Sequence, residues 1–305
     1  MKLYKNFDIS KNHRRSIILI GNFDGVHLGH QKLFKMANSY KKKFNLNIGV
    51  LTFEPMPKMF FNKDIKNFRI SSINQKNIIL KCLGVDFIIT QNFDKKFSQI
   101  KSDFFIKEIL SKKLEAKYIF VSDNFKFGNK REGNVNQLIE NEKIYDYKII
   151  KPQPLILSQK VISSTYIRSL LEQGNLKKTN KLLGRNWLIE GTVQKGRQQG
   201  KKIGFPTCNI NINDYVIAKP GVYAVKVKRK NSNKPLKAIA NLGYRPTFNQ
   251  KKILLEVHIF NFSGNLYNKY LSVEFTKFIR KEKKFKNVNQ LRKQIQKDLK
   301  IAKRN

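Results

Sequence analysis

Hydrophobic positions in the first 150 residues form short apolar runs separated by stretches with helical spacing. Each run is bounded by polar or turn residues and predicts a strand: Ser16–Ile20, Ile48–Phe53, Phe87–Thr90, Tyr118–Val121 and Tyr147–Ile150. The amphipathic stretches between them predict helices over Gln31–Lys43, Asn74–Leu83, Ser102–Leu114 and Val135–Glu140. This alternation predicts a mainly parallel sheet with helices on both faces, which binds ligands at the carboxyl ends of its strands.

A change of pattern follows this first part. Two short helices are predicted over Tyr166–Gln173 and Leu176–Leu183, and each is followed by a glycine that suits a helix end. We place the domain boundary after Gly184, which divides the chain into residues 1–184 and residues 185–305.

From Trp187 onward, strand-like runs follow one another without intervening helices. They predict a small antiparallel barrel or sandwich with strands over Leu188–Gln194, Val222–Arg229, Leu236–Asn241, Ile253–Phe260 and Leu271–Ile279. A basic amphipathic stretch, Val288–Ala302, predicts a closing helix.

Charge and composition narrow the functional classes. The 305 residues carry a formal net charge of +41, with 62 Lys and Arg against 21 Asp and Glu. Such a charge attracts polyanions, but the lysines are spread along the whole chain with abundant Asn and Ile, as an AT-rich genome would produce. We therefore expect no specific nucleic acid partner.

Membrane and secreted classes are disfavoured. The apolar runs are too short to cross a bilayer, and the polar segment Met1–Arg15 lacks the apolar core of a signal peptide. Only two cysteines, Cys82 and Cys208, are present, and we expect a reducing cytoplasm.

The segment Gly21–His30 is the strongest candidate for chemistry in the first half. It follows the first predicted strand and opens the first helix, where free N–H groups and the helix dipole suit a phosphate. His27 and His30, at i and i+3, can both face that phosphate. The alternatives are ordinary turn histidines or a zinc site, but no cysteine or third histidine lies nearby in sequence to complete the latter.

A glycine-rich segment, Gly196–Asn209, is the strongest candidate in the second half. Gly196, Gly200 and Gly204 recur every four residues and indicate a loop that folds over phosphates, although their order with Lys and Thr is not that of a Walker loop. Further on, Glu256 and His258 share one face of a predicted strand. The plain alternative for Glu256 is an exposed carboxylate paired with a lysine.

These segments resemble, in the same order, the motifs of the prokaryotic bifunctional riboflavin kinase/FAD synthetases, which are FMN adenylyltransferases. Gly21–His30 resembles the signature of the nucleotidyltransferase superfamily, and Gly196–Asn209 resembles the riboflavin kinase loop, with Cys208 in place of the usual alanine. Further matches are Thr52–Pro57, Asn124–Gly128, Ser163–Arg168 and Leu182–Arg185. The resemblance covers nearly the whole chain and implies a Rossmann-like nucleotidyltransferase domain followed by a riboflavin kinase-like β-barrel.

The resemblance implies that the first domain joins FMN to the α-phosphorus of ATP, giving FAD and pyrophosphate. His27 and His30 then hold the ATP phosphates, and Arg168 pairs with the departing phosphates. Phe53 contacts the flavin. The other implied nucleotide-binding residues are Gly21, Phe23, Asp24, Gly25, Asn124, Ser164 and Thr165.

For the second domain, the resemblance implies phosphorylation of riboflavin to FMN by ATP. Glu256 is the implied general base for the 5′-hydroxyl of riboflavin, and Thr207 and Asn209 hold Mg²⁺ with the ATP phosphates. Arg280 contacts the flavin or its phosphate. The loop residues Gly196, Gly200 and Gly204 bind the nucleotide, whereas His258 is expected to pack or hydrogen-bond.

Two rival hypotheses are considered, of which the first belongs to another class of protein. One is a nucleic-acid-binding protein that kept an old enzyme scaffold, which the charge of +41 motivates. The other is an enzyme with one inactive half. The His-x-Gly-His and Phe-Pro-Thr-x-Asn motifs are both intact, and a binding module needs neither, so we favour the bifunctional enzyme.

Overall fold

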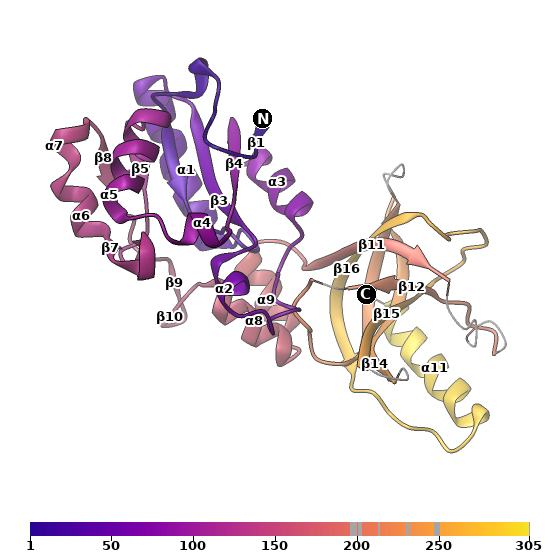
Figure 1. Ribbon diagram of the computed structural model, residues 1–305. Coiled ribbons are helices and arrows are strands. Elements are labelled where there is room, and N and C mark those ends of the chain that lie inside the picture. Colours follow the sequence, from indigo (N-terminus) through magenta and orange to yellow (C-terminus); the bar gives the residue numbers. More distant parts are fainter. Residues whose placement is uncertain are drawn as a thin grey trace. The chain divides into compact units, whose positions relative to one another are not determined.

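The computed structural model describes residues 1–195, 200, 203–212, 214–229, 232, 234–246 and 251–304. The chain divides into two units, shown in Figure 1. The first unit contains Met1–Ile65 and Ile73–Ile162, and the second contains Lys66–Ser72 and Ser163–Asn305. The helices between Ser164 and Leu183 thus pack within the second unit, and the functional boundary after Gly184 stays a prediction.

The first unit is built on a six-stranded sheet in the order β1-β4-β3-β2-β5-β8, in which every pairing is parallel. Its strands are β1 (Lys2–Tyr4), β2 (Ile17–Ile20), β3 (Ile48–Glu54), β4 (Phe87–Asn92), β5 (Tyr118–Phe120) and β8 (Lys148–Ile150). The five predicted strands are confirmed. The edge strand β1 was not predicted, because its three residues form no apolar run.

The predicted helices are also present, with additional short ones. The helices are α1 (Leu28–Phe44), α2 (Pro57–Phe61), α3 (Ile73–Cys82), α4 (Lys95–Ser98), α5 (Ser102–Phe104), α6 (Val135–Glu140) and α7 (Glu142–Tyr145). The predicted helix over Ser102–Leu114 continues beyond α5 as a π-helix over Phe105–Lys113. Two short hairpins pair β6 (Lys126–Phe127) with β7 (Gly133–Asn134) and β9 (Ile156–Leu157) with β10 (Lys160–Val161).

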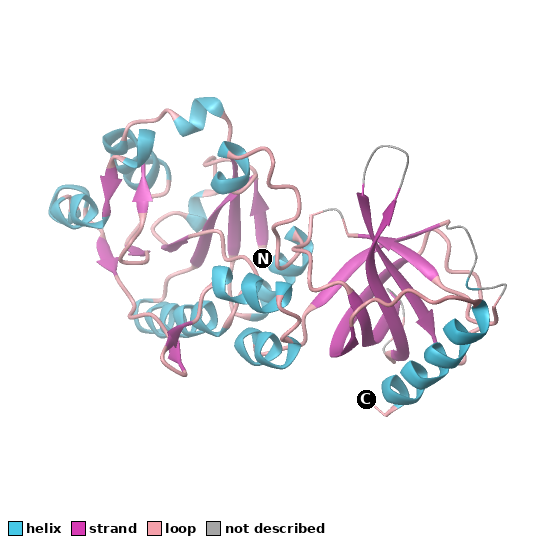
Figure 2. Cartoon of the chain, turned by 90° about the horizontal axis from the view of Figure 1, so that it is seen from below, coloured by secondary structure: helices cyan, strands magenta, loops and turns pink. Residues whose placement is uncertain are grey.

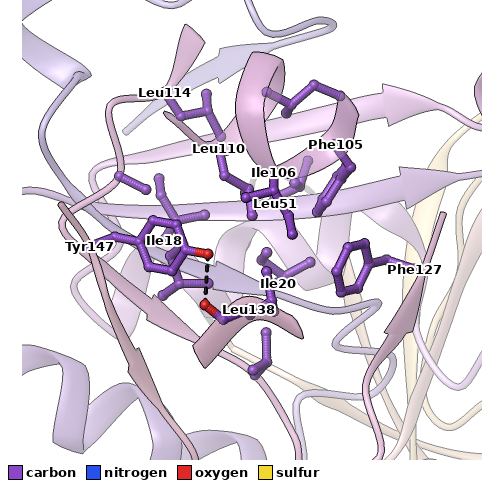
Figure 3. Packing of buried hydrophobic residues seen from close by; sticks show 14 of the residues in the cluster. Ile18, Ile20, Leu51, Phe105, Ile106, Leu110, Leu114, Phe127, Leu138 and Tyr147 are labelled. Atoms are coloured by element: carbon purple, nitrogen blue, oxygen red, sulfur yellow. Dashed lines mark hydrogen bonds between the residues drawn. The ribbon is translucent and has the colours of Figure 1, made fainter. Parts of the chain in front are cut away.

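Alternate residues of β2 enter two separate cores, one on each face of the sheet. Ile17 and Leu19 pack with residues of α1 and α3, including Phe34 and Leu80. Ile18 and Ile20 pack on the opposite face, in the cluster shown in Figure 3. That cluster also contains Leu51, Phe105, Ile106, Leu110, Leu114, Phe127, Leu138 and Tyr147. The sheet is therefore covered on both faces, as its continuous apolar strands predict.

The strand order places a topological switch point beside β2. The chain runs from β2 to β3 and β4 on one side, and then returns to β5 on the other side. In open parallel sheets, ligands bind outside the carboxyl ends of the strands at such a point. The turn after β2 and the segment after β5 both lie at this edge.

The second unit contains a closed antiparallel barrel in the order β11-β12-β15-β14-β13-β16, with β16 paired to β11. The strands are β11 (Leu188–Gln194), β12 (Cys208–Asn211), β13 (Gly221–Arg229), β14 (Leu236–Pro246), β15 (Lys251–Ile259) and β16 (Tyr270–Arg280). Figure 2 shows α11 (Val288–Lys303) lying along the barrel, and its Ala302 packs with Val222, Ala224 and Ile239. The barrel prediction is confirmed, and β12 was missed.

Helices α8 (Ser164–Glu172) and α9 (Leu176–Leu183) complete the second unit. The indole N–H of Trp187 donates to the carbonyl of Ile70 at 2.8 Å, which ties the segment Lys66–Ser72 to the barrel. No helix among the described residues is long and apolar enough to cross a membrane.

Tyr147 offers a test of the packing in the first unit. Its hydroxyl donates to the buried carbonyl of Leu138 at 2.8 Å, so Tyr147→Phe should lower the free energy of unfolding by about 1 kcal/mol. Tyr145→Phe is the matched control, because no hydrogen bond of that hydroxyl is found within the described residues. Urea unfolding followed by circular dichroism measures both, and equal effects of the two substitutions would contradict the prediction.

Candidate active sites

His27 begins α1 and uses its own side chain as the N-cap. Its Nδ1 accepts a hydrogen bond from the backbone N–H of His30 at 3.4 Å. An accepting Nδ1 leaves the proton of the neutral ring on Nε2. A Cβ at Gly29 would lie 3.1 Å from the same Nδ1, so a side chain there would press on the imidazole and require it to shift by a few tenths of an ångström.

The turn before His27 is strained. Phe23, Gly25 and Val26 have φ of +48°, +77° and +37°, in the left-handed region. For Phe and the β-branched Val this conformation is costly, and such strain is concentrated at functional sites. The side chains of Phe23, Asp24 and Val26 are buried and hold the turn in place.

The two histidine rings of the motif stack on each other. Their centroids lie 3.7 Å apart at an interplanar angle of 19°, and Phe23 contacts the His30 ring edge-on at 5.2 Å. Burial, together with the charges of His27 and Lys76, holds the pKa of His30 well below its ordinary value of 6.5. His30 is therefore neutral at pH 7.

Lys76 is a residue of this region that the sequence interpretation missed. It lies on α3 with 5% of its surface exposed. Its ammonium donates to Thr52 Oγ1 at 3.0 Å and to the carbonyl of Asn22 at 3.3 Å. One lysine among 62 basic residues carries no signal by itself. Its position on the buried face of a predicted helix was the available clue.

Two other predicted residues of the first unit lie at the carboxyl edge of the sheet. Asn124 follows β5, is exposed, and accepts a hydrogen bond from Ser122 at 2.8 Å. Phe53, near the end of β3, is half-buried and contacts Phe93 and Phe97 at ring distances of 5.9 and 5.7 Å. Phe61, 69% exposed, also contacts Phe93. A partly exposed aromatic surface is therefore available there.

Ser164, Thr165 and Arg168 lie on α8, in the second unit. The helix predicted from Tyr166 begins two residues earlier, at Ser164, because Ser163 caps α8 by accepting from the N–H of Tyr166 at 3.2 Å. Arg168 donates to the carbonyl of Phe68 at 2.8 Å, and its guanidinium lies 3.6 Å from the centroid of that ring. That these residues serve the same nucleotide as His27 stays a prediction.

In the second unit, the barrel and α11 enclose a cavity of about 730 Å³. Five predicted site residues line it: Gly200, Thr207, Asn209, Glu256 and Arg280. Strand register explains part of this grouping, because Asn209 on β12 lies directly opposite Glu256 on β15. Gly196 lies outside the described residues. Gly204 has a φ of +88°, as a tight turn requires, and does not line the cavity.

Most of the other side chains of this cavity's wall are apolar, and the polar ones are Asn241, His258, Glu282, Lys283 and Asp298. The apolar side chains come from the barrel and from α11 and include Val222, Ile239, Phe285, Leu291 and Ile295. A cavity whose wall combines apolar surface with several polar groups suits a flat aromatic ligand.

A second cavity, of about 540 Å³, borders the first. Thr207 lines both cavities. The other lining residues include Cys208, Val257 and the segment from Phe262 to Tyr267. Burial raises the pKa of the Cys208 thiol to about 11, which keeps it protonated and unreactive.

Arg280 and His258 are both engaged within the protein. Arg280 forms an ion pair with Asp298 of α11 at 2.7 Å, and Asp298 is 2% exposed. His258 Nδ1 donates to the carbonyl of Pro206 at 2.7 Å, so this histidine fixes the segment before β12. Among the described residues, no group of three or more His, Cys, Asp or Glu side chains is arranged to hold a metal ion.

Comparisons with known proteins match the two parts of the chain to two families of enzymes. A family model described as FAD synthetase matches residues 9–166, and one described as riboflavin kinase matches residues 183–305. A bifunctional riboflavin kinase/FMN adenylyltransferase of Buchnera aphidicola subsp. Schizaphis graminum is 40% identical over 100% of this chain and 98% of its own length. One of Haemophilus influenzae is 39% identical over 94% of this chain and 92% of its own length.

A solved structure is similar over both units. A crystal structure named as a macrolide-efflux protein from Streptococcus pneumoniae matches with a TM-score of 0.86 and 31% identity, covering 99% of this chain and 98% of that one. Its name differs from those of the curated relatives. The likeness shows a shared fold.

The depressed pKa of His30 predicts a pH-dependent stability. As the pH falls below 6.5, the unfolded state takes up a proton at this histidine before the folded state does. The free energy of unfolding should therefore fall between pH 7 and pH 5, with a shallower slope in His30→Asn. Proton NMR of the four histidines checks the cause directly. The signal lost in His30→Asn should titrate well below 6.5, and titration at or above that value would contradict the prediction.

Proposed function

The chain belongs to the family of bifunctional riboflavin kinase/FMN adenylyltransferases, and we propose that it makes FAD in two steps at two sites. The barrel unit phosphorylates riboflavin to FMN with ATP. The parallel-sheet unit then joins FMN to the α-phosphorus of a second ATP and releases pyrophosphate. This proposal rests mainly on one observation: a single cavity is lined by Gly200, Thr207, Asn209, Glu256 and Arg280.

In the barrel, we assign riboflavin to the larger cavity and ATP to the smaller one. The apolar wall of the larger cavity suits the isoalloxazine ring. Thr207 borders both spaces, so a γ-phosphate held near it would face the 5′-hydroxyl of riboflavin. Glu256 lines the riboflavin side and would accept the proton of that hydroxyl as it attacks.

Thr207 and Asn209 fit a Mg²⁺ ion bound together with the ATP phosphates. Within the described residues, Asn209 Oδ1 is buried without a hydrogen-bond partner, and Asn209 and Thr207 both line the larger cavity. Mg²⁺ prefers a few protein oxygens completed by phosphate and water. The ion would neutralise charge on the transferred phosphoryl group when bound.

In the parallel-sheet unit, we assign the triphosphate of ATP to the start of α1. The rings of His27 and of the neutral His30, with the backbone N–H groups of Leu28 and Gly29 at the start of α1, are suitable donors. Gly21, Phe23, Asp24 and Gly25 shape this turn. Asn124 lies at the same sheet edge, after the neighbouring strand β5. Ser164, Thr165 and Arg168 stay assigned to the nucleotide phosphates by their motif.

The flavin of FMN is assigned to the aromatic surface that includes Phe53. Base-like rings stack on such side chains in offset or edge-on arrangements. Both cysteines are free, one exposed and one buried, which fits the cytoplasm as the place of action.

Turnover of flavins tests the proposal. The purified protein, incubated with riboflavin, ATP and Mg²⁺, should form FMN first and then FAD, as separated by liquid chromatography. Omission of ATP is the control. A protein that binds nucleic acid in a salt-dependent manner and forms neither flavin would refute the proposed function.

Paired variants test whether the two sites are independent. His27→Ala with His30→Ala should lower FAD formation from supplied FMN by at least about 10²-fold and leave FMN formation unchanged. Glu256→Gln should lower FMN formation by about 10²- to 10⁴-fold and leave FAD formation unchanged. Each variant is the other's control, and loss of both activities in either folded variant would argue against separate sites.

A further inference from the structure

One row of side chains crosses five strands of the barrel and faces the larger cavity. Residues that lie directly opposite each other on paired antiparallel strands point to the same face of the sheet. In order of these pairings, the row consists of Asn209, Glu256, Asn241, Val222 and Arg280. All five line the larger cavity. Asn241 therefore lies between the proposed general base, Glu256, and the apolar side chain of Val222.

Asn241 contacts a carboxylate that lines the same cavity. Its Nδ2 donates to Glu282 Oε1 at 3.4 Å, and Glu282 is an exposed residue just after the end of β16. Gly243, which follows Asn241 on β14, makes room for that carboxylate, because a Cβ there would collide with Glu282 Oε1. Asn241 and Glu282 thus form an amide–carboxylate pair beside the apolar part of the cavity.

This amide–carboxylate pair has a counterpart in the chemistry of riboflavin. The isoalloxazine ring is joined to the 5′-hydroxyl by a ribityl chain, which carries several secondary hydroxyl groups. With the ring against the apolar wall near Val222 and the 5′-hydroxyl at Glu256, this chain passes Asn241. Hydroxyl groups that leave water need hydrogen-bond partners. An amide offers both donors and acceptors for them, and a carboxylate offers acceptors.

We propose that Asn241 and Glu282 bind the secondary hydroxyls of the ribityl chain and thereby select flavins that carry a polyol chain. This inference rests on the proposed riboflavin kinase function of the barrel and adds two specificity-determining residues to it. A site that hydrogen-bonds the hydroxyls of its substrate discriminates against an analogue that lacks them, because the polar groups of the site are then left unpaired.

Two flavin substrates separate recognition of these hydroxyls from other effects. One is riboflavin, and the other is a synthetic flavin in which an unbranched pentyl chain with only the terminal hydroxyl replaces the ribityl chain. With ATP and Mg²⁺, the wild-type protein should phosphorylate riboflavin with a kcat/KM about 10- to 100-fold higher. The difference should lie mainly in KM, because hydroxyls away from the reacting phosphorus are bound equally in the ground state and the transition state.

Asn241→Leu and Glu282→Met remove the polar atoms and keep the approximate size of each side chain. Each should lower kcat/KM for riboflavin by about 10-fold and lower that for the analogue much less, so that the preference for riboflavin shrinks. Asn211→Leu is the matched control, because Asn211 is also a half-buried asparagine on a barrel strand but is not among the residues that line the cavity.

Gly243→Ala tests the amide–carboxylate pair without changing either member. The added methyl group should displace the Glu282 carboxylate, which can move because it is the end of a flexible side chain. This variant should therefore lose part of the preference for riboflavin, in a chain whose circular dichroism matches that of the wild type.

The outcomes distinguish this inference from the proposed function. An equal loss for both flavins in Asn241→Leu, or an unchanged preference in Asn241→Leu, Glu282→Met and Gly243→Ala, would overturn the inference. If Asn241→Leu does not fold, an unchanged preference in the other two variants overturns it. A wild-type protein that phosphorylates both flavins equally well would contradict it while riboflavin kinase activity stands. A wild-type protein that phosphorylates neither flavin would instead overturn the proposed function.

Discussion

The hydrogen bond from the His30 backbone N–H to Nδ1 of His27 joins the fold of the first unit to its proposed chemistry. It starts α1, leaves the proton of a neutral His27 ring on Nε2, and leaves little room for a side chain at position 29. The strained turn that precedes it is held by buried Phe23 and Val26, which belong to the core on one face of the sheet. The donors of this site are thus positioned by packing rather than by a mobile loop, as preorganised electrostatic sites require.

In the barrel, strand pairing rather than a strained turn positions the site residues. Antiparallel pairing places Asn209 opposite Glu256, and Glu256 opposite Asn241 on its other side. A proposed metal ligand and the proposed general base are therefore set at a fixed spacing by strand register. The Arg280–Asp298 ion pair connects the end of β16 to α11, whose apolar residues close the riboflavin side of the cavity.

Much of the fold could be predicted because apolar periodicity reports burial. The strands buried on both faces, such as β2, and the amphipathic helix α11 were found close to their observed bounds. β1 and β12 were missed, because β1 is a three-residue edge strand and β12 has one strongly apolar residue, Ile210, between polar neighbours. The packing of α8 and α9 within the second unit depends on contacts such as that between Asn180 and Phe275, which local patterns do not encode.

Prediction of the site residues was limited in the same way, because local motifs do not encode contacts between residues that are far apart in sequence. Motifs identified His27, Asn209 and Glu256, since each stands in an unusual local context. Lys76 could not be identified in this way, because only the fold buries it beside Asn22 and Thr52, which are far from it in sequence. Arg280 was predicted as a flavin contact, and its ion pair with Asp298 became visible only once β16 and α11 were placed together.

The fate of individual phosphorus atoms tests the two-site account most directly. With ATP radiolabelled at the γ-phosphorus, riboflavin should yield labelled FMN, and FAD made from it should keep that label. With ATP labelled at the α-phosphorus, FMN should stay unlabelled and FAD should become labelled. Label from the α-position in FMN, or FAD that lacks it, would contradict the account.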